Sequence, residues 1–286
     1  MGAVDHVRWL RRPALDRPVL VAAFEGWNDA GDAASGAVRY LIDRHDAEKV
    51  AEIDPEEFFD FTSTRPQVEI GDDGVRRIVW PTTEVYAASL PGEAGDVLLL
   101  VGPEPQLRWR TYCRQVTELA TLMGCRLVVL LGALVAEVPH SRPVPVVGTG
   151  TDPELQARLG LKPSTYEGPT GVVGVLSAAC RDAGLPAASL WAAVPTYVPT
   201  APSPKAALAL LERTAEVLGA WVPTTDLEIA AAAYERQVSE LVQEDDETSD
   251  YVSQLEQRHD ADDDDEGAAR SLVEEVERFL REGPSD

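Results

Sequence analysis

The sequence has no apolar run long enough to cross a bilayer, although 44% of its 286 residues are hydrophobic. A membrane-spanning helix needs about 20 consecutive apolar residues. The first residues, MGAVDHVRWLRRP, also lack the apolar segment of a secretory signal. We therefore expect a globular protein of the cytoplasm that has no membrane partner.

Cysteine is scarce, with Cys113, Cys125 and Cys180 as its three positions. Their spacing is not that of metal ligands, and Cys113 and Cys180 fall on apolar helical faces, which is typical of reduced core residues. The stretch GTGT at residues 148–151 lacks the spacing of a dinucleotide-binding motif. The sequence thus predicts no metal, no disulfide and no cofactor.

Positive charge is also in short supply, because 25 Lys and Arg stand against 49 Asp and Glu for a net charge of -24. Binding to a phosphate backbone depends on lysine and arginine, so nucleic acid is a poor partner. The acidity is uneven: residues 226–286 hold 21 acidic and 5 basic side chains. This part of the chain reads as a solvated extension.

Four short apolar runs alternate with helical patterns, as in an α/β protein with a parallel sheet. They are Val19 to Phe24, Asp96 to Val101, Leu127 to Val138, where Gly132 predicts a bend or bulge, and Ser189 to Val194. Shorter β-like pieces lie between them, including Phe58 to Phe61 and a hairpin around Gly71 to Gly74. We expect an α/β core at residues 1–225 and an acidic helical extension at 226–286, with a mobile linker near 244–266.

The most informative stretch is the polar turn between the first of these strands and the helix that follows it. It places Glu25, Trp27, Asn28 and Asp29 at the carboxyl end of a strand, where open α/β sheets build ligand sites. Asn28 and Asp29 have an alternative role as helix caps, which is common for both residue types. Glu25 and Trp27 have no such structural explanation.

Polar residues follow the other predicted strands too, and parallel strands would bring all of them to one edge of the sheet. The catalytic candidates are Glu25, Asp29 and His140, and the ligand-binding candidates are Trp27, Asn28, Glu104, Arg142, Glu167, Thr170 and Tyr197. Thr170 opens a glycine-rich helix entry that could hold an anion or serve close packing alone. Such a cleft could support acid-base hydrolysis or phosphorolysis; the alternative is a polar rim on a fold that does not catalyse.

Four ordered motifs, FEGWNDAGDAA, GPEPQLRWR, PHSRPVPV and YEGPTGVVGVL, give the chain a family resemblance. Over roughly residues 5–225 it resembles the proteasome assembly chaperone 2 family, especially uncharacterised members from high-GC Gram-positive bacteria. The resemblance implies a three-layer α/β/α core similar to the purine nucleoside phosphorylase and hydrolase type, often with carboxyl-terminal helices. It also implies oligomers and ATP-independent assembly or chaperone activity, and it carries over no catalytic residue set.

The resemblance has one departure. Relatives that dock into proteasome pockets use a carboxyl-terminal hydrophobic-tyrosine-any tripeptide, whereas this sequence finishes with Gly283 to Asp286. A proteasome partner is therefore possible but not expected through that route.

Our leading hypothesis is a homo-oligomeric protein-binding or assembly factor without catalysis. The competing hypotheses are a hydrolase or phosphorylase-like enzyme, and a small-ligand sensor that uses the same cleft without turnover.

Overall fold

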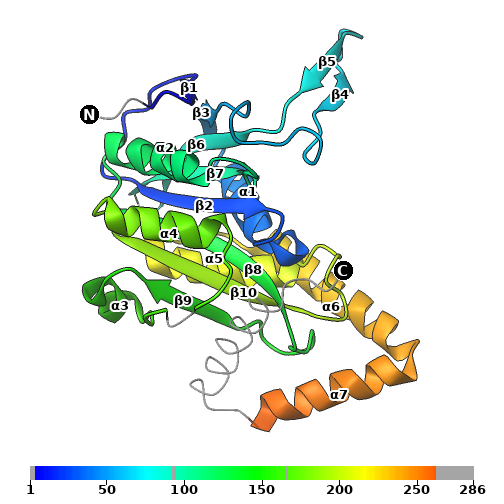
Figure 1. Cartoon of the computed structure of the whole chain (residues 1–286). Helices are drawn as coiled ribbons and strands as arrows, with labels where there is room; N and C mark the ends of the chain where they lie inside the picture. Colours follow the sequence, from blue (N-terminus) through cyan, green and yellow to red (C-terminus); the bar gives the residue numbers. More distant parts are fainter. Residues whose placement is uncertain (1–3, 92–94, 165–166, 262–286) are drawn as a thin grey trace.

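The computed structural model describes residues 4–91, 95–164 and 167–261 as a mixed α/β fold with helices on both faces of one large sheet (Figure 1). The eight strands of this sheet follow the order β1-β3-β6-β7-β2-β8-β10-β9. In that order their bounds are Val7–Trp9, Glu48–Ile53, Thr83–Leu90, Gly95–Pro103, Val19–Glu25, Leu127–Ala136, Ala187–Pro195 and Val146–Gly150. The described part of the chain has no helix long and apolar enough to span a membrane.

The centre of the sheet is parallel, as the apolar runs predicted. Strand β2 pairs in parallel with β7 on one side and β8 on the other, and β8 pairs in parallel with β10. Six of the seven residues of β2 are buried, since both faces of this strand are covered. The outer strands β6, β3, β1 and β9 are antiparallel, so the sheet is mixed.

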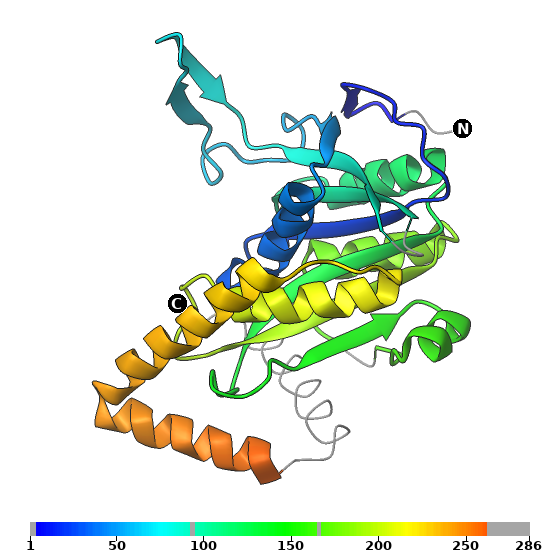
Figure 2. The same cartoon turned by 180° about the vertical axis from the view of Figure 1, so that it is seen from behind.

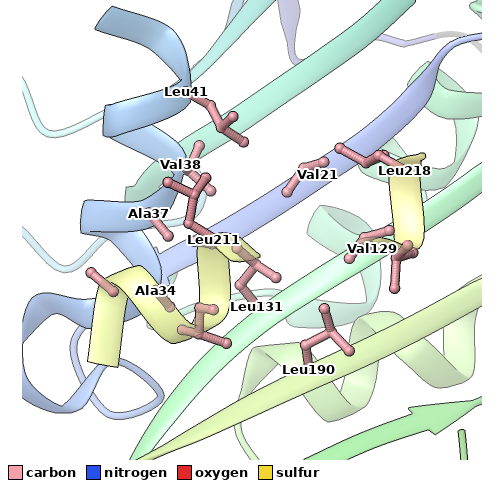
Figure 3. Packing of buried hydrophobic residues seen from close by; sticks show 14 of the residues in the cluster. Val21, Ala34, Ala37, Val38, Leu41, Val129, Leu131, Leu190, Leu211 and Leu218 are labelled. Carbon is pink, nitrogen blue, oxygen red and sulfur yellow. The ribbon is translucent and has the colours of Figure 1, made fainter. Parts of the chain in front are cut away.

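Helices cover the two faces of the sheet separately. On one face α1 (Ala33–Arg44) and α5 (Pro204–Leu218) pack on alternate residues of the central strands, such as Val21, Val129 and Leu190 (Figure 3). On the other face lie α2 (Trp109–Leu122) and α4 (Val172–Asp182), with Leu20 and Phe24 of β2 beneath them. The short helices η1 (Ala30–Asp32) and α3 (Pro153–Leu159) complete the body. Cys113, Cys125 and Cys180 are all buried with free thiols, and burial raises the pKa of each to about 12.

Gly132 lies in the middle of β8 without the predicted bulge, because the β8–β10 register runs unbroken from Ala187 opposite Val128 to Pro195 opposite Ala136. Its partner in that register is Trp191, whose ring lies over the glycine. A Cβ at position 132 would come within 2.5 Å of that ring. The glycine is therefore explained by the space that the indole occupies.

Two short strands form a separate sheet that projects from the body (Figures 1 and 2). Strand β4 (Gln67–Ile70) pairs with β5 (Arg76–Val79) in antiparallel fashion, which confirms the hairpin predicted around Gly71 to Gly74. The strand predicted at Phe58 to Phe61 is wrong, because this segment forms turns. The position of an apolar residue in these turns has a different explanation: the Phe58 ring is buried and packs edge-on against Tyr112 and His6.

Two long helices extend from the body at the carboxyl-terminal side (Figure 2). They are α6 (Thr225–Gln243) and α7 (Asp246–Ala261). Much of the linker expected near residues 244–266 is therefore helical; residues 262–266 lie outside the described part of the chain. The Asp245 carboxylate accepts the Thr248 amide at 2.9 Å, which caps α7, and Val252 and Leu255 bury its apolar face.

Candidate functional site

The carboxyl ends of β2 and β7 lie side by side and bring four of the predicted site residues together. We call Glu25, Asn28, Asp29 and Glu104 the carboxyl-edge cluster. Glu25 is opposite Pro103 in the parallel register, and the Glu104 amide donates to the Glu25 carbonyl at 2.9 Å. The Glu25 carboxylate forms an ion pair with Arg39 of α1. This ion pair between the end of β2 and α1 is a structural role for Glu25 that was not predicted from the sequence.

Glu104 is the centre of this cluster. Its Oε1 atom accepts hydrogen bonds from Asn28 Nδ2 and from the backbone amide of Val172, both at 2.8 Å. Val172 is the first residue of α4, so the anion at this helix terminus is the protein's own carboxylate. Burial raises the pKa of Glu104 above its usual value, and the two hydrogen bonds oppose that effect.

Asp29 serves the next helix in a similar way. Its Oδ1 atom accepts the amides of Ala34 at 2.6 Å and Ser35 at 3.1 Å, so the predicted capping role is present, five and six residues downstream. Asp29 is buried, and its Oδ2 atom has no hydrogen-bond partner among the residues described. Burial is the main cause of its raised pKa. A raised carboxyl pKa suits a general acid, but this carboxylate is not open to solvent.

The remaining candidates near this edge are more peripheral. Gly171, not Thr170, is the cap residue of α4, and Thr170 is exposed with its hydroxyl beside Gly174. Glu167 is exposed as well, and Trp27 is half-buried in the turn after β2. Gly171 packs against Asn28 so closely that a Cβ would lie 2.2 Å from the amide nitrogen.

His140 lies in a second group, where its ring joins the β8–β9 connection to α6. The Tyr197 hydroxyl accepts the His140 backbone amide at 2.7 Å and lies 2.9 Å from Nδ1. The Ser239 hydroxyl gives its proton to the Glu235 carbonyl, so its oxygen accepts from Nε2–H, and Nδ1 of the neutral ring accepts the proton of the Tyr197 hydroxyl. Nε2 then donates to Ser239 Oγ at 2.9 Å, which in turn donates to the Glu235 carbonyl at 2.8 Å. The network satisfies a neutral imidazole completely.

Acidification is expected to destabilise the hydrogen-bond network of His140. Burial is the main cause that lowers the pKa of His140 from its usual 6.5, and Lys205 lowers it further while Glu235 and Glu256 oppose both. A histidine with a lowered folded-state pKa contributes stability above its unfolded pKa, and loses it as the pH falls through 6.5 and then through the folded pKa. Wild-type protein should therefore lose stability relative to His140→Gln between about pH 7.5 and 5.5. Urea unfolding of both proteins across this range measures it, and parallel pH curves would contradict it.

Arg142 also belongs to the contact with the carboxyl-terminal helices. Its guanidinium makes two hydrogen bonds of 2.7 Å to the Asp260 carboxylate of α7 and lies 3.5 Å from Glu256. Ser141 donates to Glu256. We call His140, Ser141, Arg142 and Tyr197, with their partners on α6 and α7, the helical seam. No local pattern predicted these partners on α6 and α7, because they lie about 100 residues further along the chain.

Lys205 of α5 ties the seam to the body. Its ammonium donates to the His140 carbonyl at 2.5 Å and pairs with Glu235 of α6. The hollow that His140 and Lys205 line with Tyr234 measures about 10 Å³. That is about the space of one water molecule, whereas ligand pockets measure hundreds of Å³.

The predicted cleft is thus divided between two groups of residues. Among the described residues, no hydrogen bond or ion pair joins the carboxyl-edge cluster to His140 or Arg142. The described ranges also contain no group of three or more His, Cys, Asp or Glu side chains placed to hold a metal ion.

Comparison with known proteins places this geometry in a family. The PAC2 family model matches residues 23–242. A proteasome-assembly chaperone homologue from Mycobacterium tuberculosis is 46% identical, covers 82% of this chain and 99% of its own, and gives a TM-score of 0.74. A PAC2 family protein from Streptomyces avermitilis has the same identity and coverage, with a TM-score of 0.76. A Mycobacterium tuberculosis protein of unknown function is 31% identical over 99% of this chain and 97% of its own, with a TM-score of 0.84. The search of curated proteins gave no match.

Proposed function

Because the chain belongs to the PAC2 family, we propose that it is a non-catalytic protein-binding or assembly factor. Membership confirms the resemblance that the four sequence motifs predicted. One 46% identical relative is described as a proteasome-assembly chaperone homologue, which makes proteasome subunits the first partners to test. The likeness to purine nucleoside phosphorylases and hydrolases, which only the family resemblance implied, stays a prediction.

The observation that carries this proposal is that the candidate catalytic side chains form hydrogen bonds with other parts of the fold. Glu104 holds Asn28 and the first amide of α4, Asp29 holds two amides of α1, and His140 bridges Tyr197 and Ser239. A catalytic site needs a nucleophile or base, an orienting group and a stabiliser around one reacting atom. Here each group orients part of the fold instead, which supports a structural role for these residues.

The proposal predicts an effect on proteasome assembly. Purified actinobacterial proteasome α-subunits and β-subunits, mixed with an equimolar amount of the protein, should pass more quickly through the half-assembled intermediate, or form a complex with it. Native mass spectrometry over time measures both. Glu25→Gln is the matched control, because it changes the carboxyl-edge cluster without removing its volume, and it should behave as wild type. An unchanged assembly course with no complex would contradict the proposal.

The enzyme hypothesis gives the opposite pattern. If Glu25 and Asp29 act on a substrate, Glu25→Gln and Asp29→Asn should each lower turnover of nucleosides with phosphate, or of simple esters, by about 100-fold or more. Our proposal expects wild type and both variants to show the same background rate. Measured turnover that only the wild type supports would replace the assembly proposal for this site.

A further inference from the structure

The hairpin β4–β5 presents an unusual amount of apolar surface to solvent. We call residues 64–81, which contain both strands, the arm. It projects away from the main sheet in both views (Figures 1 and 2). Its exposed large apolar side chains, with their exposed fractions, are Val68 at 46%, Ile70 at 75%, Val75 at 52%, Ile78 at 51%, Val79 at 42% and Trp80 at 48%. Single exposed apolar side chains are ordinary, but a cluster of this kind marks an interaction surface.

The register of the hairpin gathers three of these six residues, Val68, Ile70 and Ile78, on one face. Val68 is opposite Ile78, and Ile70 is opposite Arg76, so these four side chains share a face of the two-stranded sheet. Glu69 and Arg77 are opposite each other on the other face. A lone two-stranded hairpin is at best marginally stable in water. The apolar face of the arm therefore needs cover, and Arg76 makes that face favour an acidic partner.

A groove of about 620 Å³ runs between the arm and the body of the same chain. Ile78, Val79 and Trp80 line its arm side, and Asp54 and Glu56 are among the residues on its body side. Arg8, Lys49, Glu52 and Glu84, which also line the groove, are already joined by ion pairs. The groove thus combines apolar side chains with exposed carboxylates, which complements the apolar face of the arm and the single guanidinium on that face, Arg76.

We propose that the groove of each copy receives the arm of a second copy of this chain. The arm itself bounds the groove, so two arms that lie side by side fill each other's grooves at once. Such an exchange is isologous and closes as a two-fold dimer. In it Ile70 and Ile78 enter the neighbour's groove, and Arg76 faces the neighbour's Glu56 and Asp54.

Charge favours the arm as the place where copies meet. The chain carries a net charge of -24, so two copies repel each other across most contacts. Residues 65–80 carry three acidic and three basic side chains, a balance that removes the repulsion locally. The exposed apolar residues of α6, Ile229 and Leu241, have acidic neighbours such as Glu228 and Glu240 and lack this balance. The inference goes beyond the proposed function, since its test measures self-association alone.

Sedimentation equilibrium of the full chain between about 1 and 100 μM tests the interface. Wild type should be dimeric, and Ile70→Asp with Ile78→Asp should raise the dimer dissociation constant by about 100-fold or more, because two central apolar contacts are lost. Ile229→Asp is the matched control, with similar exposure on a different element, and should dissociate as wild type does. A monomeric wild type, or a double variant that remains equally dimeric, would overturn the proposal.

A charge exchange tests the pairing itself and does not depend on apolar substitutions. Arg76→Glu should weaken the dimer by about 10-fold, and adding Glu56→Arg to the same chain should restore it. Glu56 is chosen because Asp54 already accepts the Glu56 amide at 3.0 Å. Both positions are exposed, so circular dichroism should show the wild-type fold for every variant. Failure of the second substitution to restore the dimer would contradict this arrangement of arm and groove.

Discussion

Glu104→Ala is expected to lower the free energy of unfolding by about 2–4 kcal/mol, measured by urea denaturation at pH 7. The side chain joins the end of β7, the turn after β2 and the amino terminus of α4 through one oxygen atom. Its removal leaves the buried Asn28 amide and the Val172 amide without their acceptor. Each stranded donor costs about 1–3 kcal/mol, because no comparable partner replaces the one lost.

Glu104→Gln is the control that separates hydrogen bonding from charge. The amide oxygen of glutamine can accept the same two hydrogen bonds, so the loss should stay below about 1 kcal/mol at pH 7. Burial raises the pKa of Glu104, so its folded-state contribution is fully present below the unfolded pKa and declines as the pH rises through the folded value. The free energy of unfolding of the wild type, relative to that of Glu104→Gln, should therefore increase as the pH falls toward 4.5. If glutamine destabilises as strongly as alanine, the hydrogen-bond account of Glu104 is wrong.

The elements that the sequence predicted correctly are those set by local pattern. The apolar run at Val19 to Phe24 gave a strand buried on both faces, and the Gly71 to Gly74 turn gave a hairpin. A capping role could be given as one of two alternatives for Asp29, because Asp29 and the amides that it accepts lie within six residues. Local spacing carries this information, since helices and tight turns are closed by neighbours in sequence.

The site residues show where local pattern fails. His140 bonds Ser239, which is 99 residues away, and Arg142 bonds Asp260, which is 118 residues away. A polar residue at a strand end looks the same in sequence whether it faces a ligand or a helix that returns from elsewhere in the chain. Glu104 likewise reaches Val172 across 68 residues, so its place at the α4 terminus could not be read from either segment alone.

The linker predicted near residues 244–266 was wrong over its helical part, Asp246–Ala261, for a different reason. Its charge density is typical of a solvated linker. The structure instead places Val252 and Leu255, three residues apart, on one buried face of α7, while the acids face solvent or meet Arg142. Two buried apolar residues in sixteen are a weak helical signal, but the cap at Asp245 and the basic partner Arg142 on the body also stabilise the helix.

Gly102→Ala is expected to cost about 3 kcal/mol of unfolding free energy, at the upper end of the usual effect of overpacking. A Cβ at this position would lie 2.6 Å from the Thr82 carbonyl oxygen and 2.8 Å from the Thr83 Cα. Both are backbone atoms, one just before β6 and one in its first residue, so they cannot move aside as a flexible side chain would. Relief requires β6 and β7 to separate near Glu84 and Val101, which are paired in the antiparallel register. Thermal and urea unfolding measure the loss.

Gly36→Ala is the matched control for this clash. Gly36 lies within α1, and its added Cβ would meet the Ala207 Cβ at 3.7 Å, an ordinary contact. Alanine should therefore stabilise the protein by about 0.5–1 kcal/mol, since glycine is unfavourable inside a helix. Gly102 also lies two residues before Glu104, so displacement of β7 should already disturb the bonds from Asn28 and Val172. The double variant Gly102→Ala with Glu104→Ala should thus lose less than the sum of the single losses. Strict additivity would show that the end of β7 does not position Glu104.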